Sequence, residues 1–302
     1  MSQINRSSAP SLLRPGLKTV FADWMIYPDQ WKSIYKFNTS DKAVEYDLEM
    51  QTLGLAQMKQ DGAAVASGAF NQAYQTAYLH QYYGLSFEIT RAAILDNLYS
   101  SQWSKDAEQL KNSLRTLKNI NAAYIFNNAF NTYSTVSDGQ PLCSTGHVIS
   151  TGTLANTFDN GVGLTEAALE EAITIIKSWL NVGGLQLDLS VTKLLVPMAN
   201  AFNASRILNS DYQPDTANNP INPIKHDKYV PGGFIVNNFI QDPNAWFLIT
   251  DEPNGFKYFQ REPLDIDFIT DVVTDNVTVR AIERYSFGNS NWRSVFGSTT
   301  SM

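Results

Sequence analysis

The chain has 302 residues, 43% of them hydrophobic and 17% charged, which is enough to bury a core and allows about two domains. Its formal net charge of −7 supplies no overall basic surface and argues against tight electrostatic binding of DNA or RNA. A single cysteine, Cys143, excludes an intrachain disulfide. The sequence has no signal-peptide pattern and no run that approaches the ~18 apolar residues of a membrane span, so we expect a soluble cytosolic protein.

Residues 1–36 contain three prolines and several aromatic residues with weak periodicity, which predicts an extended arm. Such a segment cannot bury its aromatic side chains by itself, so they must pack either on the body of the same chain or on another subunit. The sequence leaves both alternatives open. The candidate interface residues in this arm are Trp24, Tyr27, Trp31 and Tyr35.

Residues 37–89 predict a long two-stranded arm. Apolar and acidic residues alternate between Val44 and Met50, as in a half-exposed strand, and a second extended run ends near residue 89. A two-stranded ribbon is too small to be stable alone in water, so we expect it to lie on another surface, most simply a neighbouring copy. The candidate contact residues in this arm are Tyr46, Lys59, Tyr74 and Tyr78.

The region 90–131 contains no glycine or proline and predicts one long helix, roughly 60 Å in length at ~1.5 Å per residue. Its apolar stripe, at alternating spacings of four and three, comprises Trp103, Ala107, Leu110, Leu114, Leu117, Asn121 and Tyr124. The opposite, polar face carries Lys105, Glu108, Lys111, Lys118 and Asn119.

Residues 151–254 predict a mixed α/β unit. Thr165 is placed to cap a helix whose apolar stripe runs to Leu180 and which ends at Gly183-Gly184. Strand-like runs are expected at 194–196, 234–239 and 246–250, and a short helix at 198–208. Residues 209–228 are rich in Asn, Asp and Pro and predict a long loop, which is usually functional or mobile. Residues 255–302 return to strands, with a hairpin turn at Thr274-Asp275-Asn276.

No motif indicates catalysis, and we expect neither an enzyme nor a cofactor. The histidines His80, His147 and His226 lie far apart, and no H-x-x-x-H or C-x-x-C spacing marks a metal site. Four carboxylates fit a solvated strand face better than an acid/base pair: Glu262, Asp265, Asp267 and Asp271. Tyr74, Tyr78, Tyr82 and Tyr83 lack interleaved basic residues, so an interface or core role is favoured over stacking on nucleic acid.

The order of these parts resembles the HK97-type α+β fold of tailed-bacteriophage major capsid proteins. The corresponding parts are an N-terminal arm (1–36), an E-loop (37–89), a P-domain with its spine helix (90–150 and 255–302; helix about 90–131) and an A-domain (151–254). The sequence Ala129-Phe130-Asn131 with Tyr133, then Asp138-Gly139-Gln140-Pro141-Leu142-Cys143-Ser144-Thr145 and His147, is similar to the segment after the spine helix in many of these proteins, which often have Phe at the position of Cys143. Residues 284–288 and 292–297 resemble the C-termini of Mu-like major head subunits.

This resemblance implies a major capsid protein that self-assembles into the hexamers and pentamers of an icosahedral shell around packaged double-stranded DNA. It implies a place in the virion capsid after assembly in the host bacterial cytoplasm, without sequence-specific DNA binding or membrane contact. The implied partners are other copies of the chain and a portal, with a separate scaffolding protein and a decoration or cement protein as open options.

Further expectations follow from the comparison with that family. The arm starts near residue 1, so we expect neither a fused scaffolding segment nor a cleaved leader. In the prototype of the fold a Lys of the E-loop bonds covalently to an Asn of a neighbour; Lys59 lies in the E-loop, but no motif matches either partner. Deletion of residues 1–36 is expected to leave a folded chain that fails to assemble. The alternatives are an encapsulin-type nanocompartment shell and, more distantly, a soluble α/β binding module or hydrolase.

Overall fold

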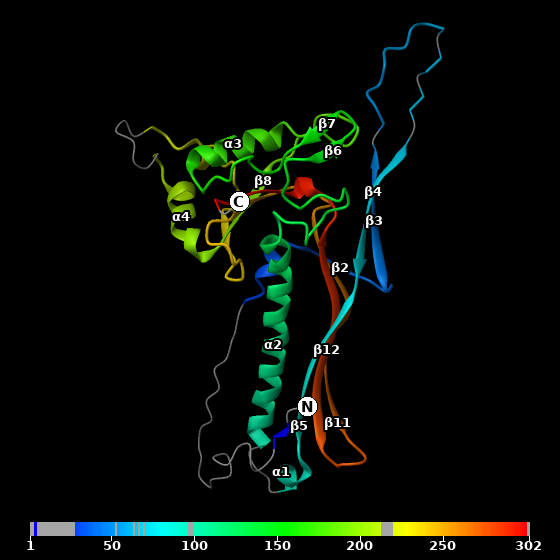
Figure 1. The fold of residues 1–302 in the computed structure, drawn as a ribbon, viewed down its shortest axis with the longest axis vertical. Coiled ribbons are helices and arrows are strands. Elements are labelled where there is room, and N and C mark those ends of the chain that lie inside the picture. Colours follow the sequence, from blue (N-terminus) through cyan, green and yellow to red (C-terminus); the bar gives the residue numbers. More distant parts are fainter. Residues whose placement is uncertain are drawn as a thin grey trace.

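The computed structural model describes residues 3–4, 28–51, 53–62, 64–65, 67–68, 70–95, 100–212 and 220–300. Two sheets organise this part of the chain: a long five-stranded sheet with one long helix along it, and a four-stranded sheet with shorter helices (Figure 1). A two-stranded hairpin projects beside them. The α+β class predicted from the sequence is confirmed.

The five-stranded sheet carries the long β-hairpin that the C-terminal alternation predicts. Its strands, in spatial order, are β1 (Gln3–Ile4), β5 (Gln81–Ile89), β12 (Val277–Asn289), β11 (Phe256–Thr270) and β2 (Lys36–Thr39). β11 and β12 are antiparallel and are joined through the predicted turn, in which Asp275 has a φ of 55°. β2 and β1 run parallel to their neighbours at the two edges of the sheet.

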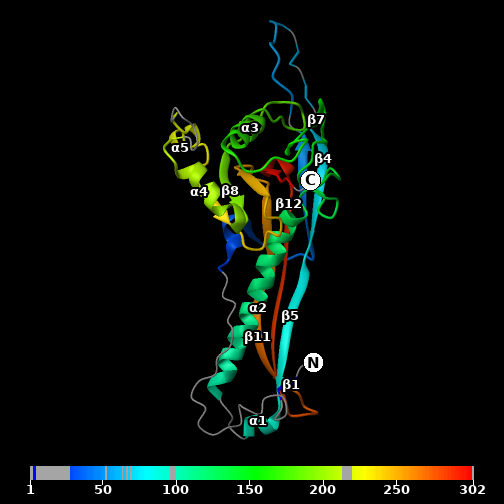
Figure 2. The same cartoon turned by 60° about the vertical axis from the view of Figure 1, so that its left-hand side comes forward.

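Helix α2 (Ser100–Asn127) lies along one face of this sheet (Figure 2). Leu110 and Leu114 of the predicted stripe pack against Ile89, Val279 and Ala281 of the strands. The prediction of a single helix over 90–131 is wrong: α2 has 28 residues, or about 42 Å at ~1.5 Å per residue, and a separate helix α1 (Arg91–Leu95) precedes it. Residues 96–99 and the side chains of Trp103, Lys105 and Ala107 lie outside the described part.

The polar face of α2 also differs from the prediction. Asn119 is buried, and its amide donates to the carbonyl of Pro28 at 3.0 Å, because the chain that enters the body at residue 28 covers this part of the helix. Lys118 points to the sheet, where its Nζ lies 2.5 Å from Oε2 of the buried Glu283. Tyr124, assigned to the apolar stripe, is exposed. Among the described side chains of the stripe, Leu110 and Leu114 are buried as predicted and Tyr124 is not.

The four-stranded sheet forms the other half of the body. Its strands, in spatial order, are β13 (Val295–Ser298), β10 (Trp246–Thr250), β8 (Val191–Val196) and β9 (Phe234–Val236). Trp246, Phe247 and Phe296 are fully buried in its core together with Trp179. Because β13 pairs with β10, residues 295–298 belong to this sheet, whereas the sequence interpretation grouped them with the strands of 255–302 that form the long hairpin.

Helices and short elements surround the four-stranded sheet. The largest are α3 (Glu166–Lys177) and α4 (Ala201–Asn209). Thr165 caps α3 as predicted, since its side chain accepts a hydrogen bond from the backbone N–H of Ala168 at 3.2 Å, but α3 ends before Leu180. The smaller elements are β6 (His147–Ile149), β7 (Gly152–Leu154), α5 (Pro223–His226) and the 3-10 helices η2 (Gln30–Ser33), η3 (Met198–Asn200) and η4 (Trp292–Ser294). The predicted loop 209–228 thus contains α5; residues 213–219 lie outside the described part.

The turn after α2 is the part of the chain in which the capsid-like motif was noted. Gly139 has a φ of 80°, which favours glycine, and the backbone N–H of Val136 donates to the carbonyl of Gln140 at 2.9 Å. His147 is fully buried, with Nδ1 2.6 Å from Asp138 and its ring stacked on Trp292 at 4.3 Å. This turn therefore ties the end of the helix to the C-terminal segment.

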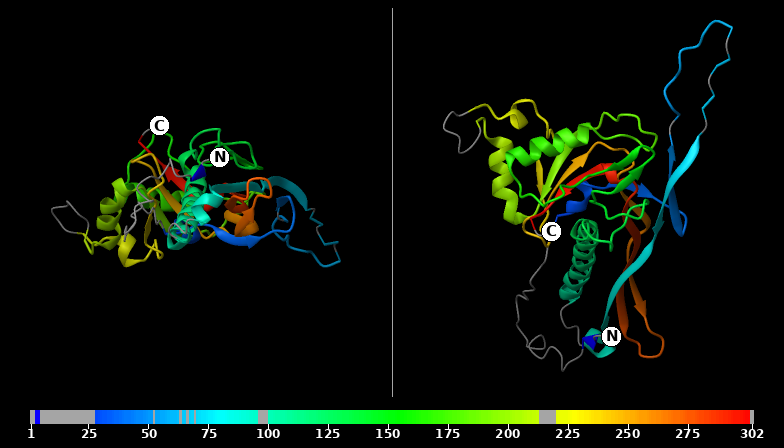
Figure 3. Two further views of the ribbon diagram at one scale, coloured as in Figure 1. Left: turned by 90° about the horizontal axis from the view of Figure 1, so that it is seen from below. Right: turned by 45° about the horizontal axis from the view of Figure 1, so that its top comes forward.

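The projecting hairpin consists of β3 (Val44–Gln51) and β4 (Asn71–Leu79), which pair only with each other among the described strands. β5 follows directly but belongs to the five-stranded sheet. The free arm is therefore shorter than the predicted range of 37–89. Figure 3 shows the described residues between β3 and β4 extending well beyond the body.

Candidate assembly interface

The β3–β4 hairpin turns its apolar side chains away from the body. Tyr46 is 61% exposed, Leu48 49%, Met50 46% and Leu79 57%. Val44 lies opposite Leu79 in the antiparallel register, so all five residues share one face of the hairpin. We call Val44, Tyr46, Leu48, Met50 and Leu79 the outer hairpin face. Exposure of these apolar side chains to water is unfavourable, and burial against another surface would remove that cost, so this face is suited to contact with another surface.

The acidic side chains that alternate with this face point to the body instead. Those of Glu45, Asp47 and Glu49 are 19%, 26% and 24% exposed, less than their apolar neighbours. Each acid pairs with a cation: Glu45 with Lys42 at 3.2 Å, Asp47 with Lys257 at 2.5 Å, and Glu49 with Arg293 at 3.4 Å. We call Asp47, Glu49, Lys257 and Arg293 the seam. The ordinary arrangement, with the apolar face inward, is inverted here.

Tyr78 fixes the base of the hairpin to the body. Its ring packs 4.9 Å from that of Phe259 and lies directly on β12 at Gly288, where an added Cβ would overlap it. Its hydroxyl is hydrogen-bonded to Ser290, which in turn donates to Asp47 at 2.5 Å. Burial raises the pKa of Tyr78 well above its ordinary value, so the phenol stays neutral and can donate. Gly288 is required by this close approach.

The connection between β3 and β4 carries further exposed apolar side chains. Leu55, Met58, Val65 and Phe70 are all exposed, and Lys59 lies among them. The described residues of this tip project beyond every other part of the body (Figure 1). They therefore contribute nothing to the chain's own core.

The β11–β12 hairpin ends in a second apolar tip. Val272 and Val273 are almost fully exposed. The turn that presents them is built by Asp271, whose carboxylate accepts hydrogen bonds from the backbone N–H of Val273 at 3.0 Å and from the hydroxyl of Thr274 at 2.7 Å. These hydrogen bonds lower the pKa of Asp271. The turn thus presents two exposed valines as a small apolar surface that another subunit could cover.

Neither a metal centre nor a membrane helix is found within the described ranges. No three His, Cys, Asp or Glu side chains there are arranged to hold a metal ion. No helix in the same part of the chain is both long enough and apolar enough to cross a bilayer.

Comparisons with known proteins decide what this arrangement belongs to. A sequence model of the family described as "Phage capsid protein" matches residues 73–297, which is most of the chain. The chain belongs to the phage capsid protein family. A comparison with curated protein sequences gave no match.

Solved structures confirm that the fold of this capsid protein is HK97-like. A structure from Mycobacterium phage Adephagia is similar with a TM-score of 0.55 and 13% identity, covering 99% of this chain and 98% of that one. The capsid of Myoviridae phage XM1 gives a TM-score of 0.53 at 12% identity, covering 95% and 96%. The capsid of cyanophage P-SCSP1u gives 0.55 at 12% identity, covering 95% and 92%. At these identities the similarity establishes the fold.

The interface residues chosen from the sequence fall into three groups in this capsid protein. Trp24 and Tyr27 lie outside the described residues. Trp31, Tyr35 and Tyr78 are buried in the chain's own body, which leaves almost none of their surface for a neighbour; the hydroxyl of Tyr35 donates to the carbonyl of Ala122 at 2.6 Å. Tyr46, Lys59 and Tyr74 remain interface predictions: Tyr46 is on the outer hairpin face, Lys59 is in the tip, and Tyr74 is partly buried with its hydroxyl 3.1 Å from the carbonyl of Val148.

Sequence reasoning missed the direction in which the hairpin faces the body. The alternation of apolar and acidic residues on β3 was visible, but the cations that pull the acidic side inward, Lys257 and Arg293, lie 210 and 244 residues away in sequence. No local signal links such distant positions. The exposed Val272-Val273 pair, directly before the predicted turn at Thr274-Asp275-Asn276, was a usable signal, since two apolar residues at the end of a hairpin are unusual.

Proposed function

We propose that this chain is the major capsid protein of a tailed phage, and that its work is self-association into the hexamers and pentamers of an icosahedral shell around double-stranded DNA. Membership in the phage capsid family and the HK97-like fold support this proposal. The mechanism has no catalytic step. The net charge of −7 is compatible with a shell that encloses DNA without binding its phosphates tightly.

One observation carries the proposal: the outer hairpin face is apolar and turned away from the chain's own body. Tyr46, Leu48 and Met50 are each about half exposed or more. Complete burial of a Leu or Met side chain stabilises a contact by ~1.5–3 kcal/mol. In a closed shell every copy contributes such a contact and receives one, so individually modest contacts add up over the particle.

The finer assignments rest on sequence similarity and on the family. Residues 284–288 and 292–297 support a Mu-like major head subunit type. The proposal includes a portal in the same shell, a separate scaffolding protein and a decoration protein. It also includes assembly in the bacterial cytoplasm before incorporation into the virion. An encapsulin-type nanocompartment is the second candidate, because the same fold would serve it. Particles that package double-stranded DNA when terminase and portal are supplied support the phage assignment, whereas particles that retain a cargo enzyme support the nanocompartment.

The test replaces Tyr46, Leu48 and Met50 together by Ser. These side chains are exposed, so the triple variant should fold with unchanged circular dichroism yet assemble at least ~10-fold less, measured by light scattering after size exclusion and by electron microscopy. The matched control is Gln75→Ser, a polar change on the same hairpin opposite Leu48. Normal shells from the triple variant would remove the role of the outer hairpin face.

The structure also changes the truncation test suggested by the sequence. Deletion of residues 1–36 would remove Trp31 and Tyr35, both buried in the core, so the truncated chain is not expected to fold normally. A deletion that ends at residue 27 spares these side chains. If the arm contacts neighbours, this shorter deletion should reduce assembly while it lowers the unfolding free energy of the dispersed chain only slightly, because the described part that it removes is the two-residue edge strand β1.

A further inference from the structure

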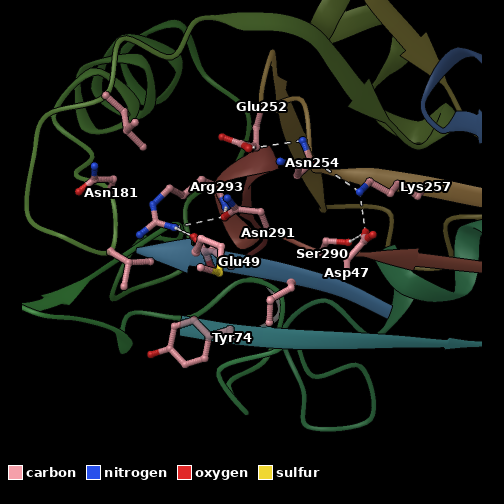
Figure 4. A pocket seen from close by; sticks show the side chains of 14 residues that line it. Asp47, Glu49, Tyr74, Asn181, Glu252, Asn254, Lys257, Ser290, Asn291 and Arg293 are labelled. Carbon is pink, nitrogen blue, oxygen red and sulfur yellow. Dashed lines mark hydrogen bonds and ion pairs between the residues drawn. The ribbon is translucent and has the colours of Figure 1, made fainter. Parts of the chain in front are cut away.

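A cavity of about 410 Å³ separates the upper half of the hairpin from the body. It lies along the seam and is lined by Asp47 and Glu49 from β3, by Lys257 and Arg293 from the body, and by Glu252 from the segment before β11 (Figure 4). Leu48 and Met50 of β3 and Val182 and Leu187 of the body also line this cavity. The hairpin therefore meets its own body through charged and apolar groups around a hollow, whereas each sheet of the body is held by an apolar core.

Arg293 is the central cation of the seam, and it is incompletely paired. Its side chain is 2% exposed. Its Nε donates to the carbonyl of Leu180 at 2.8 Å, its Nη1 lies 3.4 Å from Glu49, and the guanidinium stacks 4.4 Å from the ring of Trp292. Its Nη2 is buried and has no hydrogen-bond partner among the described residues. A buried guanidinium whose Nη2 leaves both of its N–H donors unused is an expensive contact.

Burial opposes the charged form of Arg293, Glu49 and Glu252. Desolvation is the largest cause that lowers the pKa of Arg293, and it is also the largest cause that raises the pKa of Glu49 and of Glu252. The attraction between Glu49 and Arg293 acts the other way without reversing the shifts. Buried ion pairs of this kind contribute little net stability, because the loss of hydration offsets the attraction.

The lower end of the hairpin is held differently. Tyr78 packs between Phe259 and Gly288, and Asp47 contacts both Lys257 at 2.5 Å and Ser290 at 2.5 Å. This end has close apolar packing and a complete set of short polar contacts. The hairpin is thus attached tightly at Tyr78, whereas its contact at Glu49 carries a large desolvation penalty. This difference would let the hairpin rotate about Tyr78 when the contact at Glu49 breaks.

We propose that the contact between Glu49 and Arg293 is a releasable latch, which holds the hairpin against its own body in the free chain and opens about Tyr78 when a neighbouring copy binds the outer hairpin face. Opening returns Glu49 and Arg293 to water, so the neighbour does not have to overcome a tight contact. The part that concerns the neighbour rests on the proposed function; the latch itself is a property of the dispersed chain.

The direction of the pH effect follows from linkage. In the closed position the pKa of Glu49 and of Glu252 is above the ordinary 4.5, whereas in an open, hydrated position it returns toward that value. The two carboxylates therefore bind protons more tightly in the closed state. Lowering the pH from neutral toward 4.5, the ordinary pKa of a glutamate, favours the closed state, and raising the pH favours the open state. The other charged or titratable groups facing these two are Asp47, Tyr74, Asp138, Asp251 and Arg293. Asp138 is paired with His147, and Asp47 is paired with Lys257. The pKa of Tyr74 is raised from 10.0, so it lies above the range between neutral pH and 4.5.

The experiment measures the position of the hairpin in the full, dispersed chain. Spin labels at Gln75→Cys on the hairpin and Glu170→Cys on α3 occupy exposed positions, and the buried Cys143 does not compete for the label. Distance distributions between the labels are recorded for the parent and for Glu49→Lys, which places a second cation against Arg293. We expect the ratio of closed to open populations to fall by about tenfold or more. The control Asp61→Lys makes the same charge change in the exposed tip and should leave the distribution unchanged.

Two further comparisons keep the proposal open to refutation. The closed fraction of the parent should be larger at pH 5.5 than at pH 8, and Glu49→Gln should respond less to pH. An unchanged distribution in Glu49→Lys, or a closed fraction that rises with pH, would overturn the latch. These distances are measured without assembly, so a failure of the shell proposal appears separately, as a failure of the parent chain to form particles.

Discussion

The two long hairpins of this capsid protein, β3–β4 and β11–β12, have similar alternating sequences and opposite surroundings. β11–β12 lies in a five-stranded sheet, and α2 covers the side on which Val279 and Ala281 are buried. β3–β4 has no further strand and no helix on its apolar side among the described elements, and its acidic side meets the body. Alternation thus shows that the two faces of a strand differ, but the surrounding structure decides which face is buried.

The largest test of this contrast compares an ion pair under each hairpin. Lys118→Met leaves Glu283, 2% exposed in its side chain, buried without its cation, and should lower the free energy of unfolding by ~3–5 kcal/mol in denaturant titrations. Lys257→Met removes the cation beside Asp47, but this carboxylate is 26% exposed and still accepts a hydrogen bond from Ser290, so a loss of ~1 kcal/mol or less is expected.

The double variant Lys118→Met/Glu283→Leu is the control for this test, because it removes both charges and should restore most of the stability. Equal losses for Lys118→Met and Lys257→Met would mean that the two hairpins are attached to the body in the same way.

A second comparison truncates one leucine in each region. Leu114→Ala opens a cavity between α2 and the sheet and should cost ~2–5 kcal/mol of unfolding free energy. Leu48→Ala, on the outer hairpin face, should change the stability of the dispersed chain by no more than ~0.5 kcal/mol while it weakens assembly. A large stability loss from Leu48→Ala would show that the outer hairpin face packs on the chain's own body.

The smallest expected effect concerns the attachment at Tyr78. Gly288→Ala should push the Tyr78 ring away from β12, lower the unfolding free energy by ~1–3 kcal/mol and speed hydrogen exchange in β4 more than in α2. Gly163→Ala is the matched control, because its added Cβ would meet only Thr300 at an ordinary 3.5 Å. Uniform exchange changes across the chain would argue against a local attachment.

Local patterns in the sequence were enough to predict the type and order of the main elements. The strand alternation near residues 264–268 and 277–279, the Thr165 cap and the Asp138-Gly139 turn all depend on neighbours within a few residues, and each was found where it was expected. The resemblance to capsid proteins also rested on such local order, and the family match confirms it.

Which faces are buried, and which residues are left for contact with other copies, depends on contacts between segments that are distant in sequence. Lys118 and Asn119 turned inward because Glu283 and the carbonyl of Pro28 lie there, and Trp31 entered the core beside Tyr258. The acidic side chains of the hairpin point inward because Lys257 and Arg293, which pair with them, lie on the facing surface of the body. These partners lie from 91 to 244 residues away in sequence, so no periodicity within a segment can encode them. Burial of a charge follows from its partner in space, and that partner is fixed by the fold.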